Sequence, residues 1–127
     1  VVRIVRGDLR AALEAHGDGA RDLLWYNDTS GKAVVWFMDA NVHRISSTFT
    51  VPASASNANW RVVAAGDYGE DSTGLRFTND LVWRNDTSGR LVVWFMDGGN
   101  PPTRTSGAFT VPSSATPPTD WTVVGPR

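Results

Sequence analysis

The residue types that carry out most enzymatic chemistry are present in this 127-residue sequence, but their spacing fits no known reaction. The two histidines, His16 and His43, are not paired and do not form a zinc motif of the HExxH type. No serine lies in a GxSxG elbow, and the absence of cysteine removes thiol nucleophiles and thiolate metal ligands. We therefore predict that the protein is not an enzyme.

Tryptophan is unusually frequent, with six residues in the chain. Its ring can stack on a sugar ring, and neighbouring Asn or Asp side chains can hydrogen-bond the sugar hydroxyls. Trp60 and Trp121 stand at the beginning of expected strands, next to Asn59 and Asp120 respectively. We predict that these four residues bind a glycan or a glycoprotein in the connections between two structural units.

The segments expected to form the elements that position these residues occur in two similar copies in the sequence. Segment 22–39 and segment 80–97, which begin 58 residues apart, are identical at 14 of 18 positions. Further matches pair segment 49–52 with 109–112, segment 60–63 with 121–124, and segment 1–2 with 62–63. A duplicated building block explains this pattern better than a duplicated catalytic centre does.

Each copy is expected to form four short strands, which in the second copy span 62–65, 80–84, 90–96 and 107–111. The sequence Asn-Asp-Thr-Ser-Gly at 85–89 is typical of a tight hairpin turn between two of them. Segment 90–96 is apolar on both alternating faces, which predicts a strand buried between two sheets. Trp94 and its counterpart Trp36 are therefore expected to pack rather than to bind sugar.

The segments 17–25 and 80–85 and the two VVWFMD segments resemble the FG-GAP or VCBS repeats of β-propellers. The resemblance covers nearly the whole chain. It implies an all-β fold of propeller blades, built as two four-stranded antiparallel repeats. Residues 1–59 would form the first blade and residues 60–120 the second. Residues 121–127 would form the first strand of a following blade or a closing strand.

The same resemblance implies a calcium loop of the form DxNxDGxxD between the first two strands of a blade, since Ca²⁺ takes six to eight oxygen ligands. Asp8, Asp18 and Asp22 are the residues of the first copy that could serve as its ligands. This sequence departs from the pattern, because an insert at 9–16 separates Asp8 from Asp18 and the second copy lacks the DGxxD core. The alternative is that Asp22 and Asp80 only cap the loop before a strand.

Two blades cannot close a ring, because propellers use about four to eight. The ring is therefore expected to be completed by oligomerisation or by a longer chain. We predict a homo-oligomer, since two open blades would expose apolar faces that include Trp36 and Phe37. Segment 121–124 could add as a strand to a neighbouring chain, although segment 1–5 competes for the same place.

Composition narrows the partners. Twelve Lys and Arg balance thirteen Asp and Glu without a basic stripe, so no nucleic-acid partner is expected. No apolar run reaches the roughly 18 residues that a membrane-spanning helix needs. The predicted function is that of a secreted lectin, a non-enzymatic propeller with repeated weak carbohydrate sites. A structural or adhesion module that binds protein, and accessory blades of a larger secreted protein, are the alternatives.

Overall fold

A computed structural model describes residues 2–5, 22–66, 68, 80–116 and 120–124 of the chain. Over these residues the protein is all-β, as expected, and contains two four-stranded antiparallel sheets and no helix. Sheet 1 consists of β1 (Val2–Val5), β2 (Leu23–Asn27), β3 (Ala33–Met38) and β4 (Arg44–Phe49). Sheet 2 consists of β5 (Trp60–Gly66), β6 (Asp80–Asn85), β7 (Leu91–Met96) and β8 (Arg104–Phe109).

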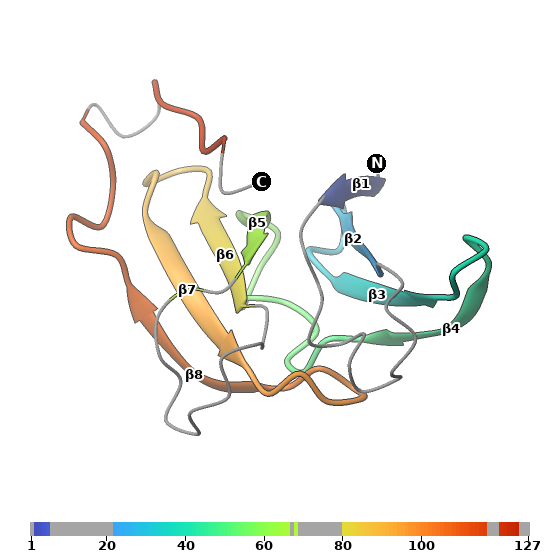
Figure 1. Ribbon diagram of the computed structural model, residues 1–127. Coiled ribbons are helices and arrows are strands. Elements are labelled where there is room, and N and C mark those ends of the chain that lie inside the picture. The colour runs from blue at the N-terminus through green and yellow to red at the C-terminus, as the bar shows by residue number, and fades with distance from the viewer. Residues whose placement is uncertain (1, 6–21, 67, 69–79, 117–119, 125–127) are drawn as a thin grey trace.

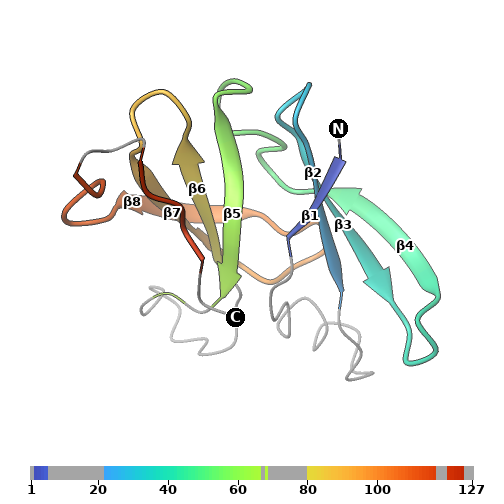
Figure 2. The same ribbon diagram turned by 90° about the horizontal axis from the view of Figure 1, so that it is seen from above.

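The two sheets lie side by side, and in each of them the strands follow one another in chain order (Figure 1). The first strands, β1 and β5, contact each other, whereas β4 and β8 lie at the far edges (Figure 2). The sheets have the same register, because Leu24 pairs with Val35 in sheet 1 as Val82 pairs with Val93 in sheet 2. The sequence duplication therefore corresponds to a duplication of the sheet.

Two details of the expected strands are wrong. Ile4 pairs with Trp25 as Val62 pairs with Trp83, so Ile4, and not Val1, is the counterpart of Val62. The last strand, β8, begins at Arg104 and not at residue 107, because Arg104 already pairs with Met96 beyond a bulge. The alignment failed at β1 because its apolar residues are interchangeable, so only the register distinguishes them.

The hairpin turns are built as the sequence predicts. The Asn27 side-chain oxygen accepts the backbone N–H groups of Thr29 and Ser30 at 2.9 and 3.0 Å. Gly31 closes the turn with φ of 72°, a left-handed conformation that favours glycine. The second turn repeats these contacts around Asn85. Side-chain capping by Asn and a permissive glycine thus fix the spacing between the second and third strands.

Replacing Gly31 by alanine should therefore destabilise the protein. A Cβ at this position would lie 3.1 Å from the Cα of Ala58, and the left-handed backbone adds a strain of about 1–2 kcal/mol. We expect Gly31→Ala to lower the free energy of unfolding by at least that amount in a urea titration. Thr29→Ala, at an exposed position of the same turn, is the control and should stay within about 0.5 kcal/mol of the parent protein. Equal effects would show that the backbone of the turn tolerates a side chain.

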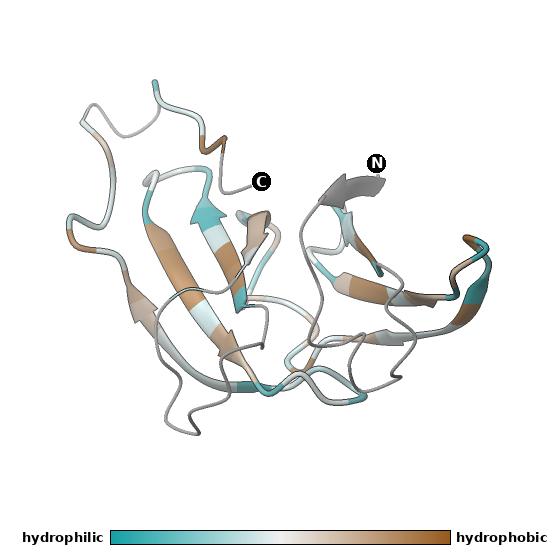
Figure 3. Cartoon of the chain, viewed as in Figure 1, coloured by the Kyte–Doolittle hydropathy of each residue, from teal (hydrophilic) through white to brown (hydrophobic). Residues whose placement is uncertain are grey.

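One hydrophobic core joins the two sheets, and the apolar segments of the central strands contribute to it (Figure 3). Sheet 1 contributes Leu24, Tyr26, Ala33, Val35 and Phe37, and sheet 2 contributes Val62, Ala65, Leu81, Trp83, Trp94 and Met96. Trp94 is buried, as expected, but its counterpart Trp36 is only half-buried. The prediction that the third strand is buried on both faces is thus only partly correct, because the core that the described residues form covers just one face of β3.

Candidate functional site

A groove of about 350 Å³ lies between sheet 2 and the segment that connects the sheets. It is lined by Pro52, Ser54, Ala55, Ser56, Trp60, Val92, Trp94, Arg104 and Phe109. Aromatic rings and Val92 supply its apolar surface, and two serines with one arginine supply its polar groups. A small number of polar groups in an apolar concavity is the usual composition of a site for a small organic ligand.

The aromatic rings of the groove are held by cation–π and ring contacts. The Trp60 and Phe109 ring centroids lie 6.4 Å apart, and the guanidinium of Arg90 lies 4.2 Å from the Phe109 ring. Arg104 lies 4.9 Å from the centroid of the Trp94 ring. Because these contacts fix the planes of the rings, the groove offers a pre-formed stacking surface.

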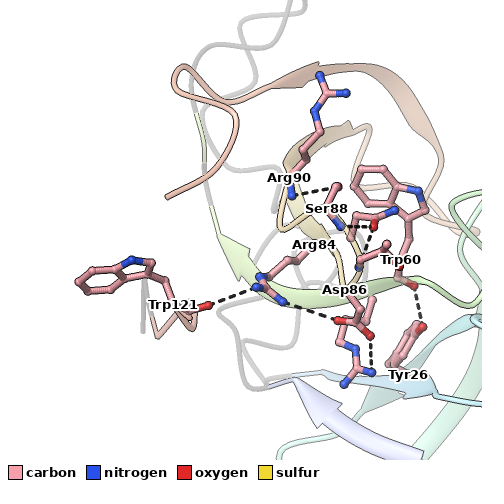
Figure 4. A network of polar contacts seen from close by, with 10 residues as sticks. Tyr26, Trp60, Arg84, Asp86, Ser88, Arg90 and Trp121 are labelled. Atoms are coloured by element: carbon pink, nitrogen blue, oxygen red, sulfur yellow. Dashed lines mark hydrogen bonds and ion pairs between the residues drawn. The ribbon is translucent and has the colours of Figure 1, made fainter. Parts of the chain in front are cut away.

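A buried tyrosine positions Trp60. The Tyr26 hydroxyl donates a hydrogen bond of 2.6 Å to the backbone oxygen of Trp60 (Figure 4). The Tyr26 ring itself packs edge-on against Trp83, with centroids 6.1 Å apart. Sheet 1 therefore sets the place at which β5 begins, and with it the place of the Trp60 ring in the groove.

The serine edge of the groove has a strained backbone. Ser56 has φ of 63°, which is uncommon for a residue other than glycine, asparagine or aspartate. The turn is closed by the N–H of Asn57, which donates to the oxygen of Ala55 at 2.8 Å. Such conformations occur often at ligand sites, where the surrounding structure holds them in place. The strain is consistent with a binding role for this edge.

Short loops precede the two arginines that lie over tryptophan rings, Arg44 at 5.0 Å from the Trp36 centroid and Arg104 over Trp94. The Asp39 carboxylate accepts the N–H groups of His43 and Asn41 at 2.8 and 2.9 Å and so closes the β3–β4 loop in front of Arg44. The N–H of His43, followed by that of Asn41, lowers the pKa of Asp39. Asp97 closes the β7–β8 loop in the same way, with bonds from Gly99 and Thr103. Arg104 follows directly, and this closure holds it at the groove.

The structure separates the four residues predicted to bind a ligand. Trp60 lines the groove, whereas Asn59 is exposed and uses its backbone oxygen to accept the N–H of Asp86. Asp120 and Trp121 are both exposed, and Trp121 lies beside Arg84 of β6, away from Trp60 (Figure 4). Of the predicted set, only Trp60 contributes to the groove.

Sequence reasoning missed Ser54, Ser56, Arg104 and Phe109. Phe109 belongs to the repeated segment 109–112, and this repetition is the sequence signal that marks it. The two serines lie in a connection of low complexity, and nothing in their local sequence distinguishes them. Only the course of the chain over sheet 2 shows that they face the aromatic rings.

The predicted calcium ligands are only partly visible, since Asp8 and Asp18 lie outside the described residues. Asp22 is buried, and one of its carboxylate oxygens accepts the N–H of Met38 at 2.9 Å. Asp80 makes the same bond to Met96 at 3.0 Å and also accepts the N–H of Tyr68. Burial of the Tyr68 hydroxyl, together with the charge of Asp80, raises the pKa of Tyr68. The bond to the third strand gives Asp22 a structural role that requires no ion.

We predict that the Asp22→Ala variant is destabilised both with and without a chelator. Losing the carboxylate leaves the buried N–H of Met38 without its acceptor, which costs about 1–3 kcal/mol. The measurement is urea unfolding of both proteins in calcium and in EDTA. If calcium binding is the main role of Asp22, the difference between variant and parent will disappear in EDTA.

No family model, curated protein or solved structure matches this chain. The part of the chain that the structure describes contains no helix long and apolar enough to cross a membrane. Fold and groove thus define an all-β protein of two antiparallel sheets with an aromatic groove at their connection.

Proposed function

We propose that this protein is a non-enzymatic, lectin-like carbohydrate-binding protein whose two sheets act as consecutive β-propeller blades. The observation that carries the proposal is the groove in which Trp60 and Phe109 present aromatic surface beside the hydroxyl groups of Ser54 and Ser56. Glycans are displayed outside cells, so the proposal includes secretion.

The chemistry of the groove suits a sugar. A sugar ring has an apolar face of C–H groups, which can lie on the rings of Trp60 or Phe109. Its hydroxyl groups can bond the serine hydroxyls and the guanidinium of Arg104. Of the described residues that line the groove, Arg104 alone has a titratable side chain. The groove is therefore equipped for binding, and its positive charge favours a neutral or acidic sugar over a basic one.

The sheet arrangement supports the propeller part of the proposal. Both sheets run in chain order from an inner first strand to an outer fourth strand, and the inner strands β1 and β5 contact each other. The two sheets also pack face to face through one core. Successive blades around a propeller axis are related in this way, and a groove between blades recurs with every repeat.

A glycan array with the labelled protein tests the proposal, followed by melting of the unlabelled protein with each positive sugar. A sugar at a hundred times its dissociation constant should stabilise the folded state by about 2.7 kcal/mol. Binding of a sugar together with a raised melting temperature is the expected result. If no sugar binds and none raises the melting temperature, the lectin proposal fails and a protein-binding module becomes the better interpretation.

A further inference from the structure

The two faces of each sheet have different partners. We call the two sides of each sheet face A and face B, and residues related by the repeat lie on the face of the same name. Face A of sheet 1 carries Leu24, Val35 and Phe37. Face B of sheet 2 carries Trp83, Trp94 and Met96. The core of the protein is formed by face A of sheet 1 against face B of sheet 2. The two faces are thus complementary, and a sheet that offers one of them can receive a sheet that offers the other.

Each sheet has a second face that is not used in this contact. Face B of sheet 1 lies outside both core clusters of the described residues and holds a pocket of about 490 Å³ lined by Trp25, Asn27, Ser30, Lys32, Val34, Trp36 and Phe49. Face A of sheet 2 carries the buried Val82 and Val93, with the half-buried Leu91 and Phe95 packed against them at its surface. The repeat makes these residues the counterparts of those in the core, because Trp25 corresponds to Trp83 and Val93 to Val35. The described residues therefore include a second copy of each half of the core contact, outside the contact itself.

The chain leaves sheet 2 as it leaves sheet 1. We call the segment that follows β4 the first exit and the segment that follows β8 the second exit. Thr50 donates to the oxygen of Ala33, and Thr110 donates to that of Leu91, both at 3.1 Å. Ala33 in turn donates to Ala53 at 2.8 Å, as Leu91 donates to Ser113 at 2.7 Å. Both exits therefore begin on the same path. In the first case this path leads over face B of the next sheet, where Pro52, Ser54 and Ser56 border the groove.

The ends of the two exits also correspond. The Tyr26 hydroxyl holds the backbone oxygen of Trp60, and at the equivalent position the guanidinium of Arg84 holds the backbone oxygen of Trp121 at 3.2 Å (Figure 4). Trp60 then enters the next sheet, whereas Trp121 is 59% exposed. The second exit is thus directed toward a position at which the described residues place no further sheet.

Exposed apolar residues mark the same contact. The backbone of Val51 bonds Pro102 and Arg104 of the next sheet, at 2.9 and 2.7 Å. Its counterpart Val111 is 98% exposed, and Val42, which takes the place of Pro102 in sheet 1, is 78% exposed. Both residues would be covered if the second exit met sheet 1 of another copy.

We propose that face B of sheet 1 is the docking site for face A of sheet 2 from a second copy of this chain. Residues 111–116 and Trp121 of that copy then cover the Trp25 and Trp36 pocket. Arg84 of the second copy, at the position of Tyr26, meets Trp25 as Tyr26 meets Trp83, in a cation–π contact. The contact is head-to-tail, so it leads to a ring or to an open chain of copies.

The first strand of sheet 1 stays in place in this contact. Strand β1 pairs with β2 and fills the inner edge of the sheet, and Trp121 to Val124 form no strand in the structure. Docking therefore proceeds through the sheet faces and needs no added strand. Whether the covered pocket also binds a sugar rests on the proposed function, but the docking itself does not.

The test is native mass spectrometry and sedimentation of the full chain without sugar. Protein concentrations up to about 1 mM are used, a thousand times a micromolar dissociation constant. We expect multiples of the 13.8 kDa chain mass for the parent protein. Phe49→Glu, on face B of β4, should give a monomer, and Ser46→Glu, on the opposite face of the same strand, should not. A monomeric parent protein would overturn the proposal and leave face B to a different partner.

A mixing experiment tests the head-to-tail geometry. Val111→Glu changes the other half of the contact at an almost fully exposed position, so folding should be unaffected, as circular dichroism can check. Each variant alone should be monomeric. Mixed in equal amounts, they should form a dimer that grows no further. The Phe49→Glu variant keeps an intact second exit, the Val111→Glu variant keeps an intact face B of sheet 1, and these two halves can form one contact only. Absence of this dimer, or assembly of either variant alone to the parent size, contradicts the proposed contact.

Discussion

Replacing Trp83 by alanine should lower the free energy of unfolding more than any other single change discussed for this protein. The Trp83 side chain is completely buried, with its ring centroid 4.7 Å from that of Trp94 and 6.1 Å from that of Tyr26. Truncation of a buried tryptophan to alanine costs about 3–5 kcal/mol, because the lost burial is joined by the cost of a cavity. Urea unfolding followed by circular dichroism measures the effect.

The matched control is Trp25→Ala, at the same place in the other sheet. Trp25 has the equivalent neighbour, since its ring centroid lies 4.7 Å from that of Trp36, but Trp25 is only half-buried on face B of sheet 1. In dilute protein, where dissociation of the copies leaves this face uncovered, we expect a loss of about 1 kcal/mol. Equal losses at Trp25 and Trp83 would contradict the assignment of sheet 1 as the sheet with the open face.

Replacing Trp60 by alanine should weaken carbohydrate binding by about tenfold or more, which corresponds to about 1.4 kcal/mol of binding free energy. The change removes stacking surface from the groove, where the Trp60 ring lies near Phe109. It leaves the fold intact, because Tyr26 bonds the backbone oxygen of Trp60 and not its side chain. Isothermal titration with a sugar identified on the array measures the affinity.

Trp121→Ala is the control for this prediction. Trp121 is the counterpart of Trp60 in the sequence repeat, yet it lies outside the groove and is exposed. In dilute protein its removal should leave the affinity unchanged. If Trp121→Ala lowers the affinity and Trp60→Ala does not, the sugar binds where the chain leaves sheet 2 and not in the groove.

Local sequence was sufficient to predict the elements of the fold but not their partners. Asn27 and Gly31 determine the hairpin turn through contacts within five residues, so their types alone predict it. The different burial of Trp36 and Trp94 could not be predicted in the same way, because both stand in the identical segment VVWFM. What distinguishes them is that only sheet 2 has a sheet packed on its face B, which is a property of position in the chain.

The candidate site shows the same limit. Trp60 was predicted because its type suits sugar stacking, and the structure places it in the groove. Asn59 was predicted only because it precedes Trp60, but its backbone oxygen is engaged with Asp86 and its side chain does not line the groove. Arg104 is more than forty residues away from Trp60 in the sequence and reaches the groove through the pairing of β8 with β7.

The proposed sugar site is the groove between the connecting segment and sheet 2. The most direct measurement is a sugar titration followed by NMR of the six tryptophan indole N–H signals, assigned by single substitution, in the Phe49→Glu variant. This variant is expected to be monomeric, so no second copy covers the Trp25 and Trp36 pocket. Among the described residues, the groove within one chain is then the only complete one. We predict that the signals of Trp60 and Trp94 shift while those of Trp25, Trp36 and Trp121 stay in place. Saturable shifts confined to Trp25, Trp36 or Trp121 would contradict this account.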